Sequence, residues 1–236
     1  MLEQTLIENQ ARELKTSKDN IAREAYEILI LQTIGESALG KNLIFKGGTA
    51  LRLAYNSPRF SEDLDFSIIK KVSFEDFKNV IENLCSKYKE IELSDLSNKR
   101  YTFFALLKIK EDFLFQRFSI KIEISKRKFS FSQKPGFEPL PLKSLVLPII
   151  VFFNVMSLET ILENKLRAVK ERIKSRDLFD IWFVSKLLKK PVGLKIKGFS
   201  KTMIRQELNR YLPKNYYYVT DYLIQTYANN RDSKKT

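Results

Sequence analysis

Hydrophobic residues recur at helical spacing through residues 2–38, with a polar break at residues 16–19. This pattern predicts two helices, because apolar side chains three or four positions apart share one face of a helix. A short apolar run at residues 42–45 ends at Gly47 and Gly48, and helical spacing resumes directly after them. Glycine tolerates the backbone conformations that a sharp turn needs. We therefore expect the two glycines to form a strand-to-helix turn.

Charged and apolar side chains alternate from Asp63 through Leu64, Asp65 and Phe66, and the alternation continues to residue 69. Successive side chains of a strand point to opposite faces of a sheet. The pattern therefore predicts a strand with Leu64 and Phe66 on one face. Asp63 and Asp65 share the other face.

The middle of the chain mixes helix and strand patterns. Residues 73–88 show helical spacing behind Ser73, a candidate N-cap. Residues 101–109 and 118–124 alternate as strands on either side of a polar loop, which resembles an antiparallel hairpin. Residues 126–143 are polar and rich in proline, so we interpret them as a linker.

Beyond this linker the pattern turns helical until the end of the chain. The expected helices span residues 157–174, 176–189, 202–211 and 220–228. A short apolar run at residues 145–155 suits a buried strand better than a membrane span. The sequence thus predicts an α+β fold, with a mixed α/β domain and N-terminal helices at residues 1–143 and a mostly helical domain at residues 144–236.

Composition narrows the possible partners and chemistry. Of the 236 residues, 44% are hydrophobic and 30% are charged, as in a soluble protein with an ordinary core. Lys and Arg number 42 against 28 Asp and Glu, a net charge of +14. Such an excess favours nucleotides or nucleic acid as partners. The alternative is that the charge reflects a lysine-rich proteome whose proteins are all basic, and does not indicate a particular partner.

The chain has no histidine and a single cysteine, Cys85. Nucleophile systems that need an imidazole, zinc bound by histidine and thiolate zinc clusters are therefore excluded. Carboxylates with a hard cation become the leading chemistry. One cysteine permits no intrachain disulfide, and no targeting or membrane segment is visible, so we expect a cytoplasmic protein.

The paired acids Asp63 and Asp65 are the candidate metal ligands. Two carboxylates on one strand face repel each other unless a cation such as Mg²⁺ or Mn²⁺ lies between them. Glu123 alternates with apolar residues on a later strand, as a third ligand would. Three such acids suit the transfer of a phosphoryl or nucleotidyl group by two metal ions. The alternative is a solvated strand edge.

The glycine turn supplies candidate nucleotide contacts. Backbone amides at the start of a helix attract phosphate, and glycine lets a triphosphate approach closely. The candidates are Lys46, Gly47, Gly48 and Thr49. The alternative is that the glycines only turn the chain. Ser61 either donates to a phosphate oxygen or caps the turn, and we favour the cap.

The motif order carries a family resemblance. Residues 45–51, Phe-Lys-Gly-Gly-Thr-Ala-Leu, precede residues 59–66, Arg-Phe-Ser-Glu-Asp-Leu-Asp-Phe. Together they resemble the glycine pair and Asp-x-Asp signature of nucleotidyltransferases, and in detail the AbiEii/AbiGii-type toxin nucleotidyltransferases. Residues 163–168 and 176–180 match the lysine-containing helix and the Arg-Asp-x-x-Asp motif of that family.

The family resemblance implies functional roles for individual residues that the sequence spacing alone does not assign. It implies that Asp63 and Asp65 bind metal, that Lys165 contacts the nucleotide phosphates, and that Asp177 or Asp180 completes the site from the C-terminal domain. At the third acid the chain departs from the common nucleotidyltransferase pattern, since an aspartate is commoner there than a glutamate. The resemblance therefore does not imply a metal role for Glu123, which rests on the strand alternation.

Residue spacing supports part of this assignment. Lys165 and Arg172 lie seven residues apart and fall on one face of the predicted helix, where two cations can meet a triphosphate. The alternative is a solvated basic face. Asp177 and Asp180 lie three apart on the next helix, and the alternative for them is structural pairing with Arg172 or Arg176.

The resemblance implies transfer of a nucleoside monophosphate from an NTP to tRNA or another RNA, and a cognate antitoxin. Residues 186–201 are basic, and tyrosines cluster near the C-terminus, which suits RNA unless they form a lysine-rich surface over an aromatic core. These tyrosines are Tyr211, Tyr216, Tyr217, Tyr218 and Tyr222. The alternatives are a kinase-like or protein-modifying NTP enzyme and a binding module without turnover.

Overall fold

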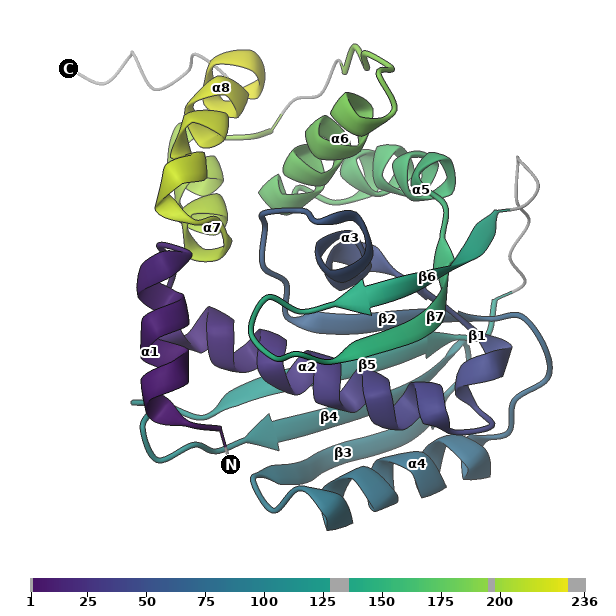
Figure 1. Cartoon of the computed structure of the whole chain (residues 1–236). Coiled ribbons are helices and arrows are strands. Elements are labelled where there is room, and N and C mark those ends of the chain that lie inside the picture. The colour runs from purple at the N-terminus through teal and green to yellow at the C-terminus, as the bar shows by residue number, and fades with distance from the viewer. Residues whose placement is uncertain (1, 128–135, 195–197, 229–236) are drawn as a thin grey trace. The chain divides into compact units, whose positions relative to one another are not determined.

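A computed structural model describes residues 2–127, 136–194 and 198–228 (Figure 1). The chain divides into two compact units, Met1–Met156 and Ser157–Thr236. Unit 1 is built on a mixed sheet and unit 2 on helices. This is the predicted α+β fold class, and the prediction is confirmed.

Unit 1 contains a seven-stranded sheet in the order β3-β4-β5-β2-β1-β7-β6. The central strand β2 runs antiparallel to β1 and parallel to β5, while β1 runs parallel to β7. The pairs β3-β4, β4-β5 and β6-β7 are antiparallel. The strands are β1 Leu43–Lys46, β2 Asp63–Ile68, β3 Ile91–Lys99, β4 Thr102–Ile109, β5 Phe118–Ser125, β6 Phe137–Lys143 and β7 Ile150–Met156.

Helices cover both faces of this sheet (Figure 1). Helix α2 packs on β5 and β7, helix α4 packs on β3 and β4, and the two helices contact each other. Beneath them lies an aromatic core in which the Phe45, Phe66 and Phe153 rings meet. Helix α3 contacts β2, β6 and β7. The helices are α1 Gln4–Glu13, α2 Lys18–Glu36, α3 Gly47–Tyr55 and α4 Phe74–Lys87, with a 3-10 turn at Gly40–Asn42.

Local signals explain where these elements begin. The Ser17 hydroxyl accepts from the Asn20 amide at the start of α2. Ser73 and Asp76 form a reciprocal capping box at the start of α4, which satisfies amides that the helix leaves unpaired. The two opening helices, the strand-to-helix turn and the hairpin between β4 and β5 agree with the sequence patterns.

The predicted domain boundary at residues 143 and 144 is wrong. Residues 126–143 are not a linker throughout, because Phe137–Lys143 forms strand β6. Prolines 139 and 141 conceal this strand in the sequence, yet an edge strand tolerates proline because one of its sides needs no ladder hydrogen bonds. Strand β7 pairs with both β1 and β6, so unit 1 extends to Met156. The predicted linker also includes residues 128–135, which lie outside the described residues.

Unit 2 consists of α5 Leu158–Glu171, α6 Ser175–Leu187, α7 Lys201–Tyr211 and α8 Tyr217–Tyr227, with a 3-10 turn at Lys214–Tyr216. Its core includes Phe179, Ile204, Leu208 and Leu223. The predicted helix at residues 157–174 is too long, since α5 ends at Glu171 and Arg172 adopts an extended backbone. Among the described residues, no helix is long and apolar enough to cross a membrane.

Candidate active site

Strand β2 separates an apolar face from an acidic one. Leu64 and Phe66 are fully buried in the core on the face that α2 covers. Asp63 and Asp65 point the other way and are only partly buried. The predicted strand and its two faces are therefore present as the alternation indicated.

Basic and acidic side chains meet on this second face. Lys46 on β1 lies opposite Asp65, and Asp65 lies opposite Glu123 on β5. Asp63 lies opposite Lys121 in the same parallel ladder. The Lys121 ammonium lies 3.4 Å from a carboxylate oxygen of Asp63 and 3.0 Å from one of Glu123. Three carboxylates and two ammonium groups thus share a single face of the sheet.

The first turn of α3 lies against Asp65. Gly47 has a φ of +86°, a conformation that favours glycine, and a Cβ built there would be 2.6 Å from an Asp65 carboxylate oxygen. A Cβ on Gly48 would contact the Arg59 guanidinium and lie 2.7 Å from the Ser61 hydroxyl oxygen. Close neighbours therefore leave no room for a side chain at either glycine, and the backbone conformation also favours glycine at position 47.

Thr49 and Ser61, two of the residues predicted to contact the nucleotide, both contact other residues of the site. The Thr49 hydroxyl donates to the Asp63 carbonyl at 2.6 Å, which joins α3 to the start of β2. Thr49 is fully buried, so its hydroxyl serves the backbone of this site. Ser61 is buried beside Gly48. Contacts from Lys46, Gly47, Gly48, Thr49 and Ser61 to a nucleotide stay predictions.

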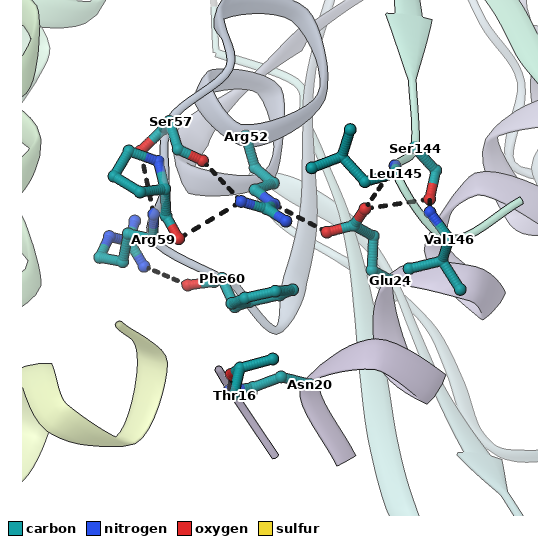
Figure 2. Close-up of polar contacts among 11 residues, drawn as sticks. Thr16, Asn20, Glu24, Arg52, Ser57, Arg59, Phe60, Ser144, Leu145 and Val146 are labelled. Atoms are coloured by element: carbon teal, nitrogen blue, oxygen red, sulfur yellow. Dashed lines mark hydrogen bonds and ion pairs between the residues drawn. The ribbon is translucent and has the colours of Figure 1, made fainter. Parts of the chain in front are cut away.

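A buried ion pair holds the segment that leads to Asp63 (Figure 2). Arg52 of α3 donates from Nε to Glu24 of α2 at 2.7 Å. The same guanidinium donates to the carbonyls of Ser57 and Pro58 and lies over the Phe60 ring. The segment between α3 and β2 is thereby fixed from within the protein.

Glu24 extends this network to the turn between β6 and β7 (Figure 2). Its other carboxylate oxygen accepts from the Ser144 hydroxyl and the Leu145 amide at 3.0 and 3.1 Å. Sequence reasoning missed Glu24 and Arg52. They lie 28 residues apart, and both occupy helices whose spacing predicts only an amphipathic surface. Buried charges of this kind are recognised from tertiary contacts.

Electrostatics distinguish the charged groups of this face. Burial, with the neighbouring Asp63 carboxylate, raises the pKa of Asp65 above its ordinary value. Burial lowers the pKa of the Lys46 ammonium. Burial also opposes the charge on Lys121, but its bond to Glu123 and the charge of Asp63 outweigh that effect and raise the pKa of Lys121. The pair of aspartates therefore favours a nearby cation.

The aspartate pair suits a divalent cation better than the predicted trio does. Two carboxylates on one strand supply the hard oxygen donors that Mg²⁺ prefers. Within residues 2–127, 136–194 and 198–228, no three acidic or cysteine side chains come together as a metal site. Glu123 instead pairs with Lys121. A metal role for Glu123 stays a prediction without support from these contacts.

Unit 2 contains a second polar cluster around Lys165. Its ammonium lies 2.8 Å from Asp177 and 2.6 Å from Asp180, and both carboxylates are fully buried. Arg172 donates to Asp177 with two nitrogens. Lys165 and Arg172 outweigh the effect of burial and lower the pKa of Asp177. The pairing of Asp177 with Arg172, left open by the sequence, is present.

Glu207 of α7 fixes the start of α6, where this cluster is built. Its carboxylate accepts from the Ser175 amide at 2.7 Å and lies 3.8 Å from Arg176. Arg176 therefore pairs with Glu207, while Asp180 pairs with Lys165. Sequence reasoning missed Glu207, because its partner amide is 32 residues away.

The predicted aromatic surface is partly present. Tyr218 and Tyr222 are exposed, and the Tyr216 and Tyr218 rings stack, whereas Tyr211 is buried. The basic segment at residues 186–201 includes residues 195–197, which lie outside the described part of the chain. Tyr218 and Tyr222 are thus accessible for stacking, whereas Tyr211 is part of the hydrophobic core.

Comparison with solved structures supports the fold. JHP933 from Helicobacter pylori aligns with a TM-score of 0.56 at 23% identity, covering 89% of this chain and 79% of that one. MenT4, a nucleotidyltransferase toxin from Mycobacterium tuberculosis H37Rv, aligns with a TM-score of 0.57 at 19% identity, covering 88% and 69%. No curated protein matches the sequence significantly.

Family comparison supports the enzymatic class. The sequence model for "Nucleotidyl transferase AbiEii toxin, Type IV TA system" matches residues 29–217. This range contains the glycine turn, the Asp63 and Asp65 pair and the Lys165 cluster. The chain is a nucleotidyltransferase and belongs to the AbiEii toxin family.

Proposed function

We propose that this enzyme transfers a nucleoside monophosphate from an NTP to an RNA acceptor, with tRNA as the acceptor class, and releases pyrophosphate. The observation that carries the proposal is the acidic pair Asp63 and Asp65 beside the first turn of α3. A divalent ion on these carboxylates, Mg²⁺ or Mn²⁺, would neutralise triphosphate charge and polarise the attacking hydroxyl.

The residues around the pair have separate tasks. Gly47 keeps the start of α3 free of side-chain atoms, so that backbone amides can face a phosphate group. Thr49 ties this turn to the backbone of Asp63, and Arg52 fixes the segment before it. The carboxylates are therefore held in place before substrate binds, which lowers the cost of orienting the reactants.

For the cluster of unit 2, we propose that Lys165 contacts the nucleotide phosphates. Two buried carboxylates hold its ammonium, so the side chain is oriented. Asp177 and Asp180 would then act on the reaction through Lys165. Lys165→Met should abolish transfer, and Arg205→Met, at an exposed ion pair of the same unit, should not.

The acceptor and the metal are tested together by labelling. Purified protein is incubated with each NTP labelled at the α-phosphate, with Mg²⁺ and total tRNA. Wild type should label the RNA, EDTA should prevent labelling, and Asp65→Asn should reduce it by at least about a hundredfold. Asp95→Asn, at an exposed acid of β3, is the matched control and should label normally. Equal labelling by Asp65→Asn and wild type contradicts the proposal.

The same labelling experiment also tests whether the acceptor is RNA or protein. Label that enters protein, with the tRNA unlabelled, would favour the protein-modifying reading. Mass spectrometry then distinguishes the transfers, since a nucleoside monophosphate and a phosphoryl group add different masses. Binding of NTP or RNA without any metal-dependent product would favour a module without turnover.

We also propose a cognate antitoxin, because the family description names a Type IV toxin–antitoxin system. Expression of the chain alone should arrest growth, and Asp65→Asn should not. Coexpression of the protein encoded by the adjacent reading frame should restore growth. Harmless expression of a folded, RNA-labelling wild type would contradict the toxin role.

A further inference from the structure

We propose that Lys121 is a built-in cation of the acidic face: it neutralises Glu123 and leaves Asp63 and Asp65 to bind a single divalent ion. The inference rests on the proposed metal-dependent function of that pair. It assigns a role to Lys121, and it removes Glu123 from the group of metal ligands.

Geometry places the Lys121 ammonium between two carboxylates from different strands. It lies 3.0 Å from Glu123 of β5 and 3.4 Å from Asp63 of β2. Lys121 and Glu123 are two positions apart on β5 and therefore share a face. A divalent ion joining Glu123 to Asp63 would have to displace this ammonium.

The net charge of this face also indicates that it binds one divalent ion. With every group ionised, the carboxylates of Asp63, Asp65 and Glu123 and the ammonium groups of Lys46 and Lys121 sum to −3 + 2 = −1. One divalent ion changes this to +1, and a second would change it to +3 in the absence of substrate. Without Lys121 the face would carry −2, which one divalent ion balances to zero, so this ion would be held more tightly.

Exposure makes the position suitable for mutation. The Lys121 side chain is about one-third exposed, as is that of Glu123. Replacing either by glutamine therefore leaves no fully buried charge without a partner. Lys108 of β4 is an exposed lysine of the same sheet, so Lys108→Gln is a matched control for the loss of one positive charge.

The test is Mn²⁺ binding to the full chain without nucleotide, measured by calorimetry and by the electron paramagnetic resonance signal of free Mn²⁺. Wild type should bind one ion. Glu123→Gln should weaken binding by no more than roughly tenfold, because it raises the charge of the face from −1 to 0 without removing a metal ligand. Lys121→Gln should bind one ion roughly tenfold more tightly. The double variant should return to wild-type behaviour, since the gain depends on the freed Glu123.

Two results would overturn the inference: a loss of affinity on Glu123→Gln as large as the loss on Asp65→Asn, or a Lys121→Gln variant that binds no better than Lys108→Gln. Circular dichroism confirms that each variant is folded. The proposed function is judged separately, by Asp65→Asn. If that variant binds Mn²⁺ as wild type does, the Asp63 and Asp65 metal pair is wrong, whereas Lys121 is still judged by the double-variant comparison.

Discussion

At the scale of single residues, the site depends on close approach. Gly47 admits the left-handed turn and leaves room for the Asp65 carboxylate, while Gly48 leaves room for Arg59 and Ser61. Charge is matched at the same scale, since Lys46 and Lys121 lie opposite Asp65 and Asp63 in the β ladder. The glycine pair and the aspartate pair therefore form one unit of structure.

Gly47→Ala should reduce transfer strongly, because a methyl group would press on Asp65 and the backbone conformation would be strained by roughly 1–2 kcal/mol. Initial rates of RNA labelling and thermal unfolding measure the two effects. Gly193→Ala is the matched control, because a Cβ there meets no atom within 4 Å. Wild-type activity of a folded Gly47→Ala protein would contradict the close approach to Asp65.

At the scale of elements, buried ion pairs fix the segments that carry the site. Arg52 joins α3 to α2 through Glu24 and also holds the chain before β2 (Figure 2). In unit 2, Lys165 of α5 joins Asp177 and Asp180 of α6. A charge that is removed from such a pair leaves its partner buried and uncompensated.

Arg52→Met should destabilise unit 1 by about 3–5 kcal/mol, because Glu24 would lose its buried partner. Urea unfolding followed by circular dichroism measures the change. Arg117→Met removes an arginine from an exposed pair with Glu92, and it should cost less than about 1 kcal/mol. Similar losses in the two variants would count against a stabilising role for the buried network.

Asp177 should make the stability of unit 2 depend on pH. Lys165 and Arg172 lower its pKa in the folded state, so its contribution is full above the unfolded pKa and is lost as pH falls through the folded pKa. Asp177→Asn should therefore lower Tm at pH 7, and the gap to wild type should shrink below about pH 4. Asp221→Asn, at an exposed pair, is the control. A gap independent of pH would contradict the charge pairing.

Local sequence patterns predicted the helices and strands that hold the site. They did not predict the contacts between residues that are far apart in the sequence. Alternation at Asp63 and Asp65 and the glycine pair predicted β2 and the turn correctly. Strand β3 was missed because it is polar and largely exposed, and β6 was missed because its prolines resemble a linker. The contact of Lys121 with Asp63 depends on the register of β2 against β5, which sequence spacing does not specify.

At the scale of the whole molecule, the charge of +14 favours a polyanionic partner. The carboxylates of Asp63, Asp65 and Glu123 oppose this field locally, where a cation is expected. We therefore expect RNA binding and catalysis to be separable, with RNA binding dependent on distributed Lys and Arg side chains and catalysis on the acidic pair.

Affinity for tRNA should fall steeply with salt. Three phosphate contacts alone would weaken binding roughly twentyfold between 50 and 200 mM monovalent salt, because bound counterions are released from the RNA. Fluorescence anisotropy with labelled tRNA measures the slope. Asp65→Asn should bind with wild-type affinity and slope while failing to transfer nucleotide. Affinity that is independent of salt would contradict the electrostatic account of acceptor binding.

The most direct test of the central claim follows the two ends of the same NTP. Reactions with tRNA and Mg²⁺ contain NTP labelled at the α-phosphate or, in parallel, at the γ-phosphate. Wild type should place the α label in RNA and release the γ label as pyrophosphate, and Asp65→Asn should do neither. Transfer of the γ label to RNA, or unchanged α labelling by Asp65→Asn, would contradict nucleotidyl transfer at the Asp63 and Asp65 pair.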